Sequence, residues 1–317
     1  MDYSIKPNPR IDGVPVQGDG WFAQDLGTGR RQVIAVWYDT GTFDSIGDYV
    51  NRPFSLCDYV IERHRADTGQ IPADGWEQVC RVTGNRYATR QHLLDLEGCR
   101  WVRLRFLRSE GTPELRFDIH DAAAGISDSW LFLGDSITAC GMGNAWGTSF
   151  AGRIHAIDPR FYPVQQNGGI GGLTSRDGRA HIRTWLADAP ARFVPVAYGT
   201  NDAWGEPNDL AAYESNLRFM LDAVLDAGKI PVLPTVPYAS DAHAGRCTAD
   251  YNAVIARLWA SYGERLVQGP DLYAFFRERP HLLSEDGVHP SEAGYEAMRR
   301  HWAQVMYARV YAPDAKL

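Results

Sequence analysis

The sequence predicts two domains, an antiparallel β-sandwich followed by a three-layer, doubly wound α/β/α domain with a mainly parallel five-stranded sheet. Up to about Asp121, short runs rich in β-branched and aromatic residues alternate with turn residues, as is typical of a sandwich. From Trp130 onward, strand-like runs alternate with helical patterns, which predicts parallel strands joined by helices. A chain of 317 residues with 44% hydrophobic residues can give each domain its own core.

The strands of the sandwich are expected at residues 31–39, 55–64, 76–82, 100–107 and 114–120. The run RWVRLRFL alternates most clearly and predicts a half-buried strand. Its two sides are Val102, Leu104 and Phe106 on one, and Trp101, Arg103, Arg105 and Leu107 on the other. The small, polar segment DAAAGISDS at residues 121–129 is the expected boundary, which places the domains at residues 1–125 and 126–317.

The strands of the second domain are expected at residues 130–134, 161–166, 192–199, 229–236 and 265–269. Between the third and fourth of these strands, apolar residues recur every three or four positions from Leu210 to Leu225. This spacing predicts a helix over residues 209–227 that Gly228 ends. A closing helix is expected from Tyr295 to Met306.

Composition excludes several kinds of partner. The net charge is −7 without a basic cluster, which disfavours a nucleic-acid surface and an anionic membrane. No apolar stretch approaches the length of a membrane span, and the start MDYSIKPNPR lacks the features of an export signal. We therefore expect a cytoplasmic location for the chain as given, with a trimmed secreted form left open. The five cysteines form no CxxC pair, so reduced thiols are expected.

Four polar or glycine-rich segments follow the expected strands: GDS at residues 134–136, NGGIGG at 167–172, GTND at 199–202 and DGVHP at 286–290. In a doubly wound sheet, ligands bind outside the carboxyl ends of the strands. We therefore expect these segments to converge at one edge. Together they supply the groups that an acyl-transfer site requires.

The residue types suggest individual roles. Ser136 is the expected nucleophile and His289 its base, because an imidazole near its ordinary pKa of about 6.5 can take the hydroxyl proton. Asp286, three residues earlier, can hold the other imidazole N–H. The oxyanion formed by the attack would be stabilised by the Ser136 backbone N–H, a glycine N–H of NGGIGG and the Asn201 amide.

The four segments, in this order, resemble the blocks of the SGNH, or GDSL-type, hydrolase family from Trp130 to the closing helix. The resemblance implies that Ser136, Asp286 and His289 form the catalytic triad. It also implies that Gly172 and Asn201 complete the oxyanion hole with the Ser136 amide. We expect no cofactor and no metal ion for this chemistry.

A narrower resemblance concerns the substrate. A β-sandwich before an SGNH domain is similar to the arrangement in carbohydrate esterase family two, whose members remove acetyl groups from polysaccharides. The sandwich itself is expected to be jelly-roll or galactose-binding-like, since residues 76–107 are similar to the strand pattern of the latter. The leading hypothesis is a metal-independent serine esterase that removes small acyl groups, most simply acetyl, from a small or oligosaccharide ester.

Other interpretations of the same residues remain open. Asp135 is expected to brace the nucleophile turn, and Asp202 to cap the turn after its strand. If Asp286 only formed a turn, Ser136 and His289 would work as a dyad. Trp146 and Trp204 could line the pocket mouth and stack on a sugar ring, or pack in the core. The histidines outside the four segments, His243 among them, are expected to be surface or packing residues.

Three functional alternatives remain beside the leading hypothesis. The first is an esterase or thioesterase for short-chain esters that are not carbohydrates. The second is a metal-dependent hydrolase, with Asp135, Asp202, Asp286 and His289 as ligands. The third is a carbohydrate-binding protein with an inactive second domain. The sequence makes no prediction of the oligomeric state.

Overall fold

The computed structural model describes residues 3–11, 16–27, 32–39, 56–65, 68–85, 87, 89–109, 115–143, 149–205 and 208–312. Within these ranges the chain forms two compact units, a sandwich unit of residues 8–127 and an α/β unit of residues 3–7 and 128–312. The chain passes from one unit to the other between Ser127 and Asp128. The boundary expected from the sequence, between residues 125 and 126, lies two residues earlier. Residues 3–7 join the α/β unit because Tyr3 packs edge to face on Phe193, with 5.7 Å between the ring centroids.

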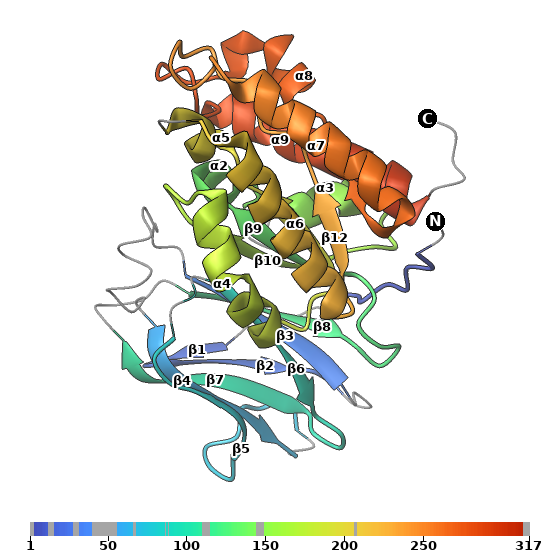
Figure 1. The fold of residues 1–317 in the computed structure, drawn as a ribbon. Coiled ribbons are helices and arrows are strands. Elements are labelled where there is room, and N and C mark those ends of the chain that lie inside the picture. The colour runs from blue at the N-terminus through green and yellow to red at the C-terminus, as the bar shows by residue number, and fades with distance from the viewer. Residues whose placement is uncertain are drawn as a thin grey trace. The chain divides into compact units, whose positions relative to one another are not determined.

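The sandwich unit consists of two antiparallel sheets (Figure 1). The five-stranded sheet has the order β1-β2-β7-β4-β5, and the three-stranded sheet has the order β6-β3-β8. The strands are β1 Val16–Gly18, β2 Trp21–Asp25, β3 Gln32–Asp39, β4 Leu56–His64, β5 Glu77–Val82, β6 Thr89–Asp95, β7 Trp101–Ser109 and β8 Leu115–Asp121. Buried residues of both sheets form one core, in which Leu94 and Ile119 of the smaller sheet join Ile61 and Leu104 of the larger. The predicted sandwich is thus confirmed.

Strand β7 shows the predicted alternation. Val102 and Leu104 are buried in the core, and Arg103 and Arg105 both form salt bridges with Glu62 of β4, at 2.7 and 2.8 Å. Trp101 departs from the pattern, since it lies on the charged side and is nevertheless buried. Strands β1, β2 and β6 were not predicted from the sequence.

The α/β unit is built on five parallel strands in the order β10-β9-β11-β12-β13. They are β9 Ser129–Gly134, β10 Val164–Gly169, β11 Phe193–Ala197, β12 Ile230–Leu233 and β13 Val267–Gln268. Every residue of β9 is buried, which explains its continuous apolar run. The predicted five-stranded parallel sheet is confirmed.

Strand β10 is displaced from its predicted position at residues 161–166. Asn167, Gly168 and Gly169 belong to the strand, where they pair in parallel with Phe132, Leu133 and Gly134 of β9. Asparagine and glycine are rare in strands, so the sequence pattern hid this extension. The segment NGGIGG is therefore half strand and half loop.

Helices cover both faces of this sheet, as predicted (Figure 1). Helices α3 Phe150–Ile157 and α9 Glu292–Met306 pack together on one face, with Trp302 of α9 in edge contact with Phe132 of β9. Helices α4 Ser175–Asp188, α6 Leu210–Asp226 and α7 Thr248–Tyr262 cover the other face. The remaining helical segments are α2 Ser136–Gly141, α5 Thr200–Trp204, α8 Leu272–Arg277, two 3-10 turns at Gly263–Arg265 and Pro280–Leu282, and a π-helical turn at Tyr307–Tyr311.

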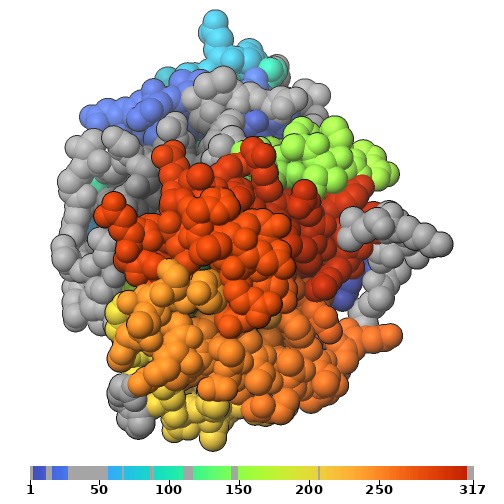
Figure 2. All heavy atoms as spheres, turned by 90° about the horizontal axis from the view of Figure 1, so that it is seen from above, coloured from blue at the N-terminus to red at the C-terminus, as the bar shows by residue number. Residues whose placement is uncertain are grey.

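The helices predicted at residues 209–227 and from Tyr295 to Met306 correspond to α6 and α9. Figure 2 looks down on the end of the α/β unit that holds α2, α5 and α8, where orange and red segments from the last third of the chain form much of the surface. None of the described helices combines the length and the apolar character needed to cross a bilayer.

Candidate active site

The ends of three neighbouring strands lie level at one edge of the parallel sheet. Gly134, the last residue of β9, pairs with Gly169 at the end of β10 and with Ala197 at the end of β11. Chain order reverses at β9, since β10 lies on one side of it and all later strands on the other. The segments that leave this switch point therefore lie side by side, as is typical of ligand sites in doubly wound sheets.

Ser136 is placed by a tight strand-to-helix turn. It is the first residue of α2, and Asp135 before it is the N-cap, whose Oδ1 accepts a hydrogen bond from the Ile137 N–H at 3.0 Å. Gly134 must be glycine, because a Cβ there would lie 2.7 Å from the Ala197 carbonyl oxygen and 2.2 Å from Thr138 Oγ1. The turn leaves Ser136 partly exposed. The prediction that Asp135 braces this turn agrees with these contacts.

Ser136, His289 and Asp286 form a continuous hydrogen-bonded chain. Ser136 Oγ lies 2.8 Å from His289 Nε2, and His289 Nδ1 lies 2.6 Å from Asp286 Oδ2. Since a carboxylate oxygen accepts, Nδ1 carries the proton, and Nε2 is left to accept from the serine hydroxyl. The structure therefore brings together the three residues predicted as a triad. The side chains of His289 and Asp286 are 40% and 48% exposed, so the chain opens to solvent.

The Asp286 carboxylate is held in its charged form. Burial raises its pKa, but bonds from the His289 ring, the Ser284 hydroxyl, and the Val288 and His289 backbone N–H groups outweigh burial. The net pKa lies well below the ordinary value for an aspartate. A charged Asp286 can hold the His289 ring and stabilise its positive charge when it takes a proton.

The loop that carries Asp286 and His289 is fixed by a second loop, between β12 and α7. The Gly287 carbonyl accepts hydrogen bonds from the Ser240 N–H at 2.7 Å and the Asp241 N–H at 3.2 Å. Gly287 has a φ of 67° and lies so close to this second loop that a Cβ would meet the Asp241 nitrogen at 2.8 Å. Both facts require glycine at this position.

Gly172 and Asn201, the predicted oxyanion donors, lie on adjoining loops. The Asn201 Nδ2 donates one hydrogen to the carbonyl of Leu173, the residue after Gly172, at 2.8 Å. A primary amide has two N–H donors, so the second stays available for a ligand. Gly172 is exposed and has a φ of 75° with open space at its Cβ position, so backbone conformation favours glycine there.

Gly169 of the NGGIGG segment lies close to the backbone of α2. A Cβ on Gly169 would lie 2.3 Å from the Ala139 nitrogen in α2. Asn167 ties the same two elements together, since its Nδ2 donates to the Ala139 carbonyl at 2.8 Å. These two residues therefore position α2, which begins at Ser136.

The sequence suggested that Asp202 caps the turn after its own strand, but the Asp202 side chain bonds to a different helix. Its carboxylate accepts from the N–H of Ser175 at 2.9 Å and from the Ser175 hydroxyl at 2.5 Å, at the start of α4. Its own carbonyl accepts from the Tyr251 hydroxyl of α7 at 2.9 Å. Burial raises the pKa of Asp202. Asp202 thus fastens α5, which carries Asn201, to the two neighbouring helices. Both partners are distant in sequence, so no local pattern could reveal them.

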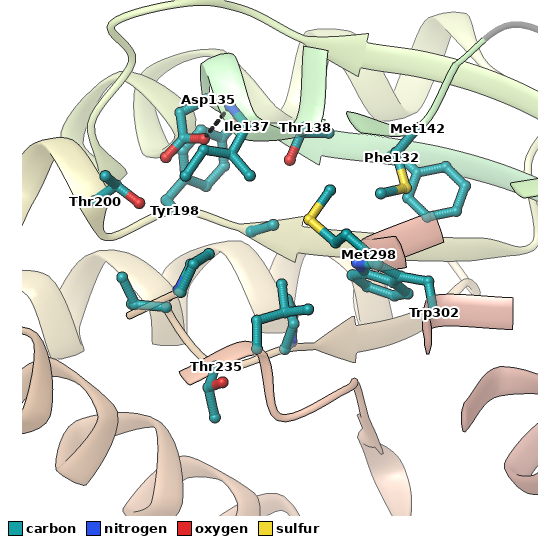
Figure 3. Close-up of a pocket in the computed structure, with 15 residues that line it drawn as sticks. Phe132, Asp135, Ile137, Thr138, Met142, Tyr198, Thr200, Thr235, Met298 and Trp302 are labelled. Carbon is teal, nitrogen blue, oxygen red and sulfur yellow. Dashed lines mark hydrogen bonds between the residues drawn. The ribbon is translucent and has the colours of Figure 1, made fainter. Parts of the chain in front are cut away.

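A small cavity of about 20 Å³ lies beneath the nucleophile turn (Figure 3). Asp135, Thr138, Thr200 and Thr235 supply its polar groups, and most of the remaining wall is apolar. Such a volume suffices for about one water molecule. Burial raises the pKa of Asp135 to about 7, and the negative charge of Asp202 adds to this effect. A second titratable carboxyl group thus lies directly behind Ser136.

Of the two tryptophans expected either at the pocket mouth or in the core, the structure describes one. Trp204, at the end of α5, is 45% exposed and so does not pack in the core. Trp146 lies outside the described residues and stays a prediction. His243, expected to be a surface or packing residue, has its Nε2 2.8 Å from the Trp204 carbonyl oxygen, which places it beside the third motif. Nothing in the sequence around His243 signals this contact.

The carboxylates proposed as metal ligands make other contacts. Asp135 caps α2, Asp202 binds Ser175 and Asp286 binds His289. Within the described residues, no three His, Cys, Asp or Glu side chains are grouped so that they could hold a metal ion. The metal-dependent alternative therefore finds no ligand set in this part of the chain.

A doubly wound sheet with a hydrogen-bonded Ser, His and Asp at its carboxyl edge is the arrangement of a hydrolase with a serine nucleophile. The chain belongs to the GDSL-like Lipase/Acylhydrolase family, whose model matches residues 132–297, slightly more than half of the sequence. It is therefore a carboxylic ester hydrolase, as predicted.

The chain is also similar to individual proteins. An acetylxylan esterase of Geobacillus stearothermophilus is 29% identical over 208 residues, which cover 56% of this chain and 92% of that protein. The solved structure of the acetylxylan esterase Axe2 from the same organism aligns with a TM-score of 0.49 at 25% identity, over 57% of this chain and 95% of that one. A lipase/acylhydrolase from Enterococcus faecalis aligns with a TM-score of 0.48 at 23% identity, over 59% and 99%.

Proposed function

We propose that this esterase removes acetyl groups from a carbohydrate through an acyl-enzyme on Ser136. The observation that carries the proposal is the continuous chain from Ser136 Oγ through the His289 ring to the Asp286 carboxylate, with contacts of 2.8 and 2.6 Å. A serine hydroxyl becomes a nucleophile only when a base accepts its proton, and this chain supplies the base and the group that orients it.

The reaction proceeds in two halves. Ser136 Oγ attacks the ester carbonyl carbon while His289 Nε2 takes the hydroxyl proton. The negative oxygen of the tetrahedral intermediate receives hydrogen bonds from the Ser136 and Gly172 N–H groups and from the second N–H of Asn201. The C–O bond to the alcohol then breaks, and the alcohol leaves with the proton from His289.

Water releases the acyl group in the second half. His289 takes a proton from the water molecule as the oxygen attacks the acyl carbon. The second intermediate collapses by breaking its bond to Ser136 Oγ, which recovers its proton from His289. Acetic acid leaves, and Asp286 stays charged throughout because its hydrogen bonds lower its pKa.

Two observations support an acetylated carbohydrate as the substrate. The relative that is 29% identical is named an acetylxylan esterase, and its match covers nearly all of that protein. In addition, the order of the two units, a sandwich followed by the catalytic unit, is similar to the arrangement in carbohydrate esterase family two. The short-chain esterase and thioesterase alternatives use the same catalytic groups and differ only in the substrate.

The nucleophile is tested by Ser136→Ala with 4-nitrophenyl acetate. Hydrolysis should be abolished while the melting temperature stays within about two degrees of wild type. A fluorophosphonate should label the wild type at Ser136 and leave the variant unlabelled. Ser261→Ala, an exposed serine at the far end of α7, is the matched control and should behave as wild type. Hydrolysis by Ser136→Ala at the wild-type rate would show that Ser136 is not the nucleophile.

The acyl group and the substrate class are tested by two further comparisons. Among 4-nitrophenyl esters, rates should fall steeply beyond acetyl; a maximum at longer chains or with thioesters would favour the alternatives. Acetate should be released from acetylated xylan. Activity that EDTA removes and a divalent ion restores would favour the metal-dependent hydrolase. Binding of acetylated glycans without turnover of any ester would favour the non-catalytic carbohydrate-binding protein.

A further inference from the structure

Helix α5 presents one aromatic side chain to solvent. Trp204 ends this helix and is 45% exposed. Across the part of the chain that the structure describes, the other exposed large hydrophobic side chains are aliphatic: Val16, Leu93, Leu107 and Ile157. A single exposed apolar residue carries no meaning by itself, so its position decides its significance.

Trp204 lies one helical turn from a proposed oxyanion donor. Residues three apart on a helix share a face, with about 5–6 Å between their Cβ atoms. Asn201 and Trp204 have this spacing on α5, and the Asn201 amide is bonded to Leu173 beside Gly172. The spacing therefore places Trp204 on the same face of α5 as Asn201.

His243 contacts both the ring and the backbone of Trp204. The two rings are in edge contact, with centroids 5.8 Å apart, and His243 Nε2 donates to the Trp204 carbonyl oxygen at 2.8 Å. Asp241 in turn fixes His243, because its Oδ1 accepts from the His243 and Ala244 N–H groups at 2.9 and 2.8 Å. Hydrogen bonds thus hold the His243 ring and backbone in place, and the Trp204 indole lies in edge contact with this fixed ring.

The same loop is joined to the catalytic residues. The Ser240 and Asp241 N–H groups donate to the Gly287 carbonyl, one residue after Asp286 and two before His289. Trp204 is therefore linked to the proposed oxyanion donor along α5, and to the His289 loop through His243 and Asp241. An exposed aromatic ring that is tied to both sides of an ester site is placed to contact the alcohol part of the ester.

We propose that Trp204, braced by His243, is the platform on which the sugar ring of the acetyl ester stacks, and that it makes the enzyme prefer sugar acetates over acetates without a ring. This inference rests on the proposed function. A pyranose ring has apolar C–H faces and a polar rim, and an indole offers a large apolar face with one N–H at its edge. Because His243 limits the rotation of the indole, less side-chain entropy is lost on binding.

The test compares two acetyl esters that differ in the alcohol. Methyl 2,3,4-tri-O-acetyl-β-xylopyranoside carries a sugar ring, whereas vinyl acetate carries none; aryl esters are unsuitable because their ring can stack too. For Trp204→Ala, we expect KM for the xyloside to rise about tenfold with kcat within twofold. For vinyl acetate, kcat/KM should stay within twofold of wild type. Trp204→Phe should recover most of the loss, and His243→Ala should show a smaller rise in KM.

Ile157→Ala is the matched control, since Ile157 is an exposed hydrophobic residue of the same unit at 41% exposure, and it should leave both substrates unchanged. The platform is overturned if Trp204→Ala changes neither substrate, or both equally. A separate measurement distinguishes this failure from failure of the proposed hydrolysis. Calorimetric titration of Ser136→Ala with the xyloside should show binding that Ser136→Ala/Trp204→Ala lacks. If the wild type binds the xyloside in the same way but releases no acetate from it, the platform stands and the proposed hydrolysis is overturned.

Discussion

Two histidines, one in each unit, lie between a hydroxyl group and a further side chain, but their surroundings differ. His289 lies between the Ser136 hydroxyl and the Asp286 carboxylate and is partly exposed. His92 of β6 is buried, with the Tyr59 hydroxyl 2.7 Å from its Nε2 and the Cys80 sulfur 3.7 Å from its Nδ1. By residue type alone, Cys80 and His92 form a nucleophile and a base as plausible as Ser136 and His289.

The environment of each ring decides what it can do. Burial, together with the positive charge of Arg90, lowers the pKa of His92 to about 3, and burial raises the pKa of Cys80. The thiol therefore stays protonated and the imidazole neutral, so the pair cannot exchange a proton at neutral pH. His289 has a charged carboxylate on its Nδ1 and faces solvent. An imidazole becomes a catalytic base through a negative partner and access to substrate, not through contact with a nucleophile.

The largest expected effect separates the two histidines by activity. His289→Ala should lower kcat/KM for 4-nitrophenyl acetate on the order of 10⁵-fold, because the serine loses its base. His92→Gln should leave kcat/KM within twofold of wild type. Steady-state kinetics with circular dichroism as a folding control measure both. If His92→Gln, still folded, lost activity to a similar degree, the distinction drawn between the two rings would be wrong.

Asp286→Asn tests the negative partner of His289. The asparagine Oδ1 can still accept the loop N–H groups, but its amide cannot accept from Nδ1–H, so the ring is driven to the wrong tautomer. We expect kcat to fall about 10³–10⁴-fold. A loss below tenfold would instead indicate that Ser136 and His289 act as a dyad, the alternative that the sequence left open.

The buried ring should be visible in the pH dependence of stability. Unfolded histidine binds its proton near pH 6.5, whereas folded His92 binds it near pH 3. The stability of the sandwich unit is therefore full above pH 6.5 and falls as the pH drops toward 3, by on the order of 5 kcal/mol. His92→Gln should remove this part of the slope, as measured by hydrogen exchange of sandwich amides. An unchanged slope would show that His92 is protonated in the folded state.

Asp135 should give the opposite slope in the α/β unit. Its folded pKa of about 7 lies above the unfolded value, so its contribution is full below about pH 4 and is lost as the pH rises through 7. Asp135→Asn retains a cap acceptor for the Ile137 N–H and removes the charge. The variant should exceed wild type in α/β-unit stability at pH 8 by on the order of 4 kcal/mol. The sandwich amides serve as the internal control, since their exchange should not change.

The smallest expected effect concerns the proposed oxyanion donor. Asn201→Ala removes one hydrogen bond to the developing negative oxygen, and kcat should fall about 10²–10³-fold with KM nearly unchanged. Arg218→Ala, on the remote surface of α6, is a control for nonspecific loss. A rise in KM without a fall in kcat would place Asn201 in ground-state binding rather than in the oxyanion hole.

The sequence predicted the parts of the molecule whose patterns are local. The strand–loop–helix alternation predicted the α/β unit, and the four short motifs pointed to Ser136, Asp286 and His289, which the structure joins by hydrogen bonds. Strands β1 and β2 were not predicted because they are short, and β6 was not predicted because its TRQHLLD run is largely polar. The extension of β10 into Asn167–Gly169 depends on pairing with β9, which intrinsic preference does not report.

The missed features depend on residues that are far apart in the chain. The bond between Asp202 and Ser175 spans 27 positions, and the contact between His243 and Trp204 spans 39. The near-neutral pKa of Asp135 follows from burial in the folded unit and from the negative charge of Asp202, which lies on a later segment. Such properties are set by the packing of the complete unit, so residue identity and spacing cannot supply them.

The distance along the chain between Ser136 and His289 also bears on folding. The hydrogen bond between them closes 153 residues, and the bond from Arg299 Nη1 of α9 to the Gly141 carbonyl of α2 closes 158. Contacts of such long sequence separation form only after costly loop closure. Recovery of esterase activity during refolding is therefore expected to report a late stage of assembly of the α/β unit, reached after α9 has docked on α2.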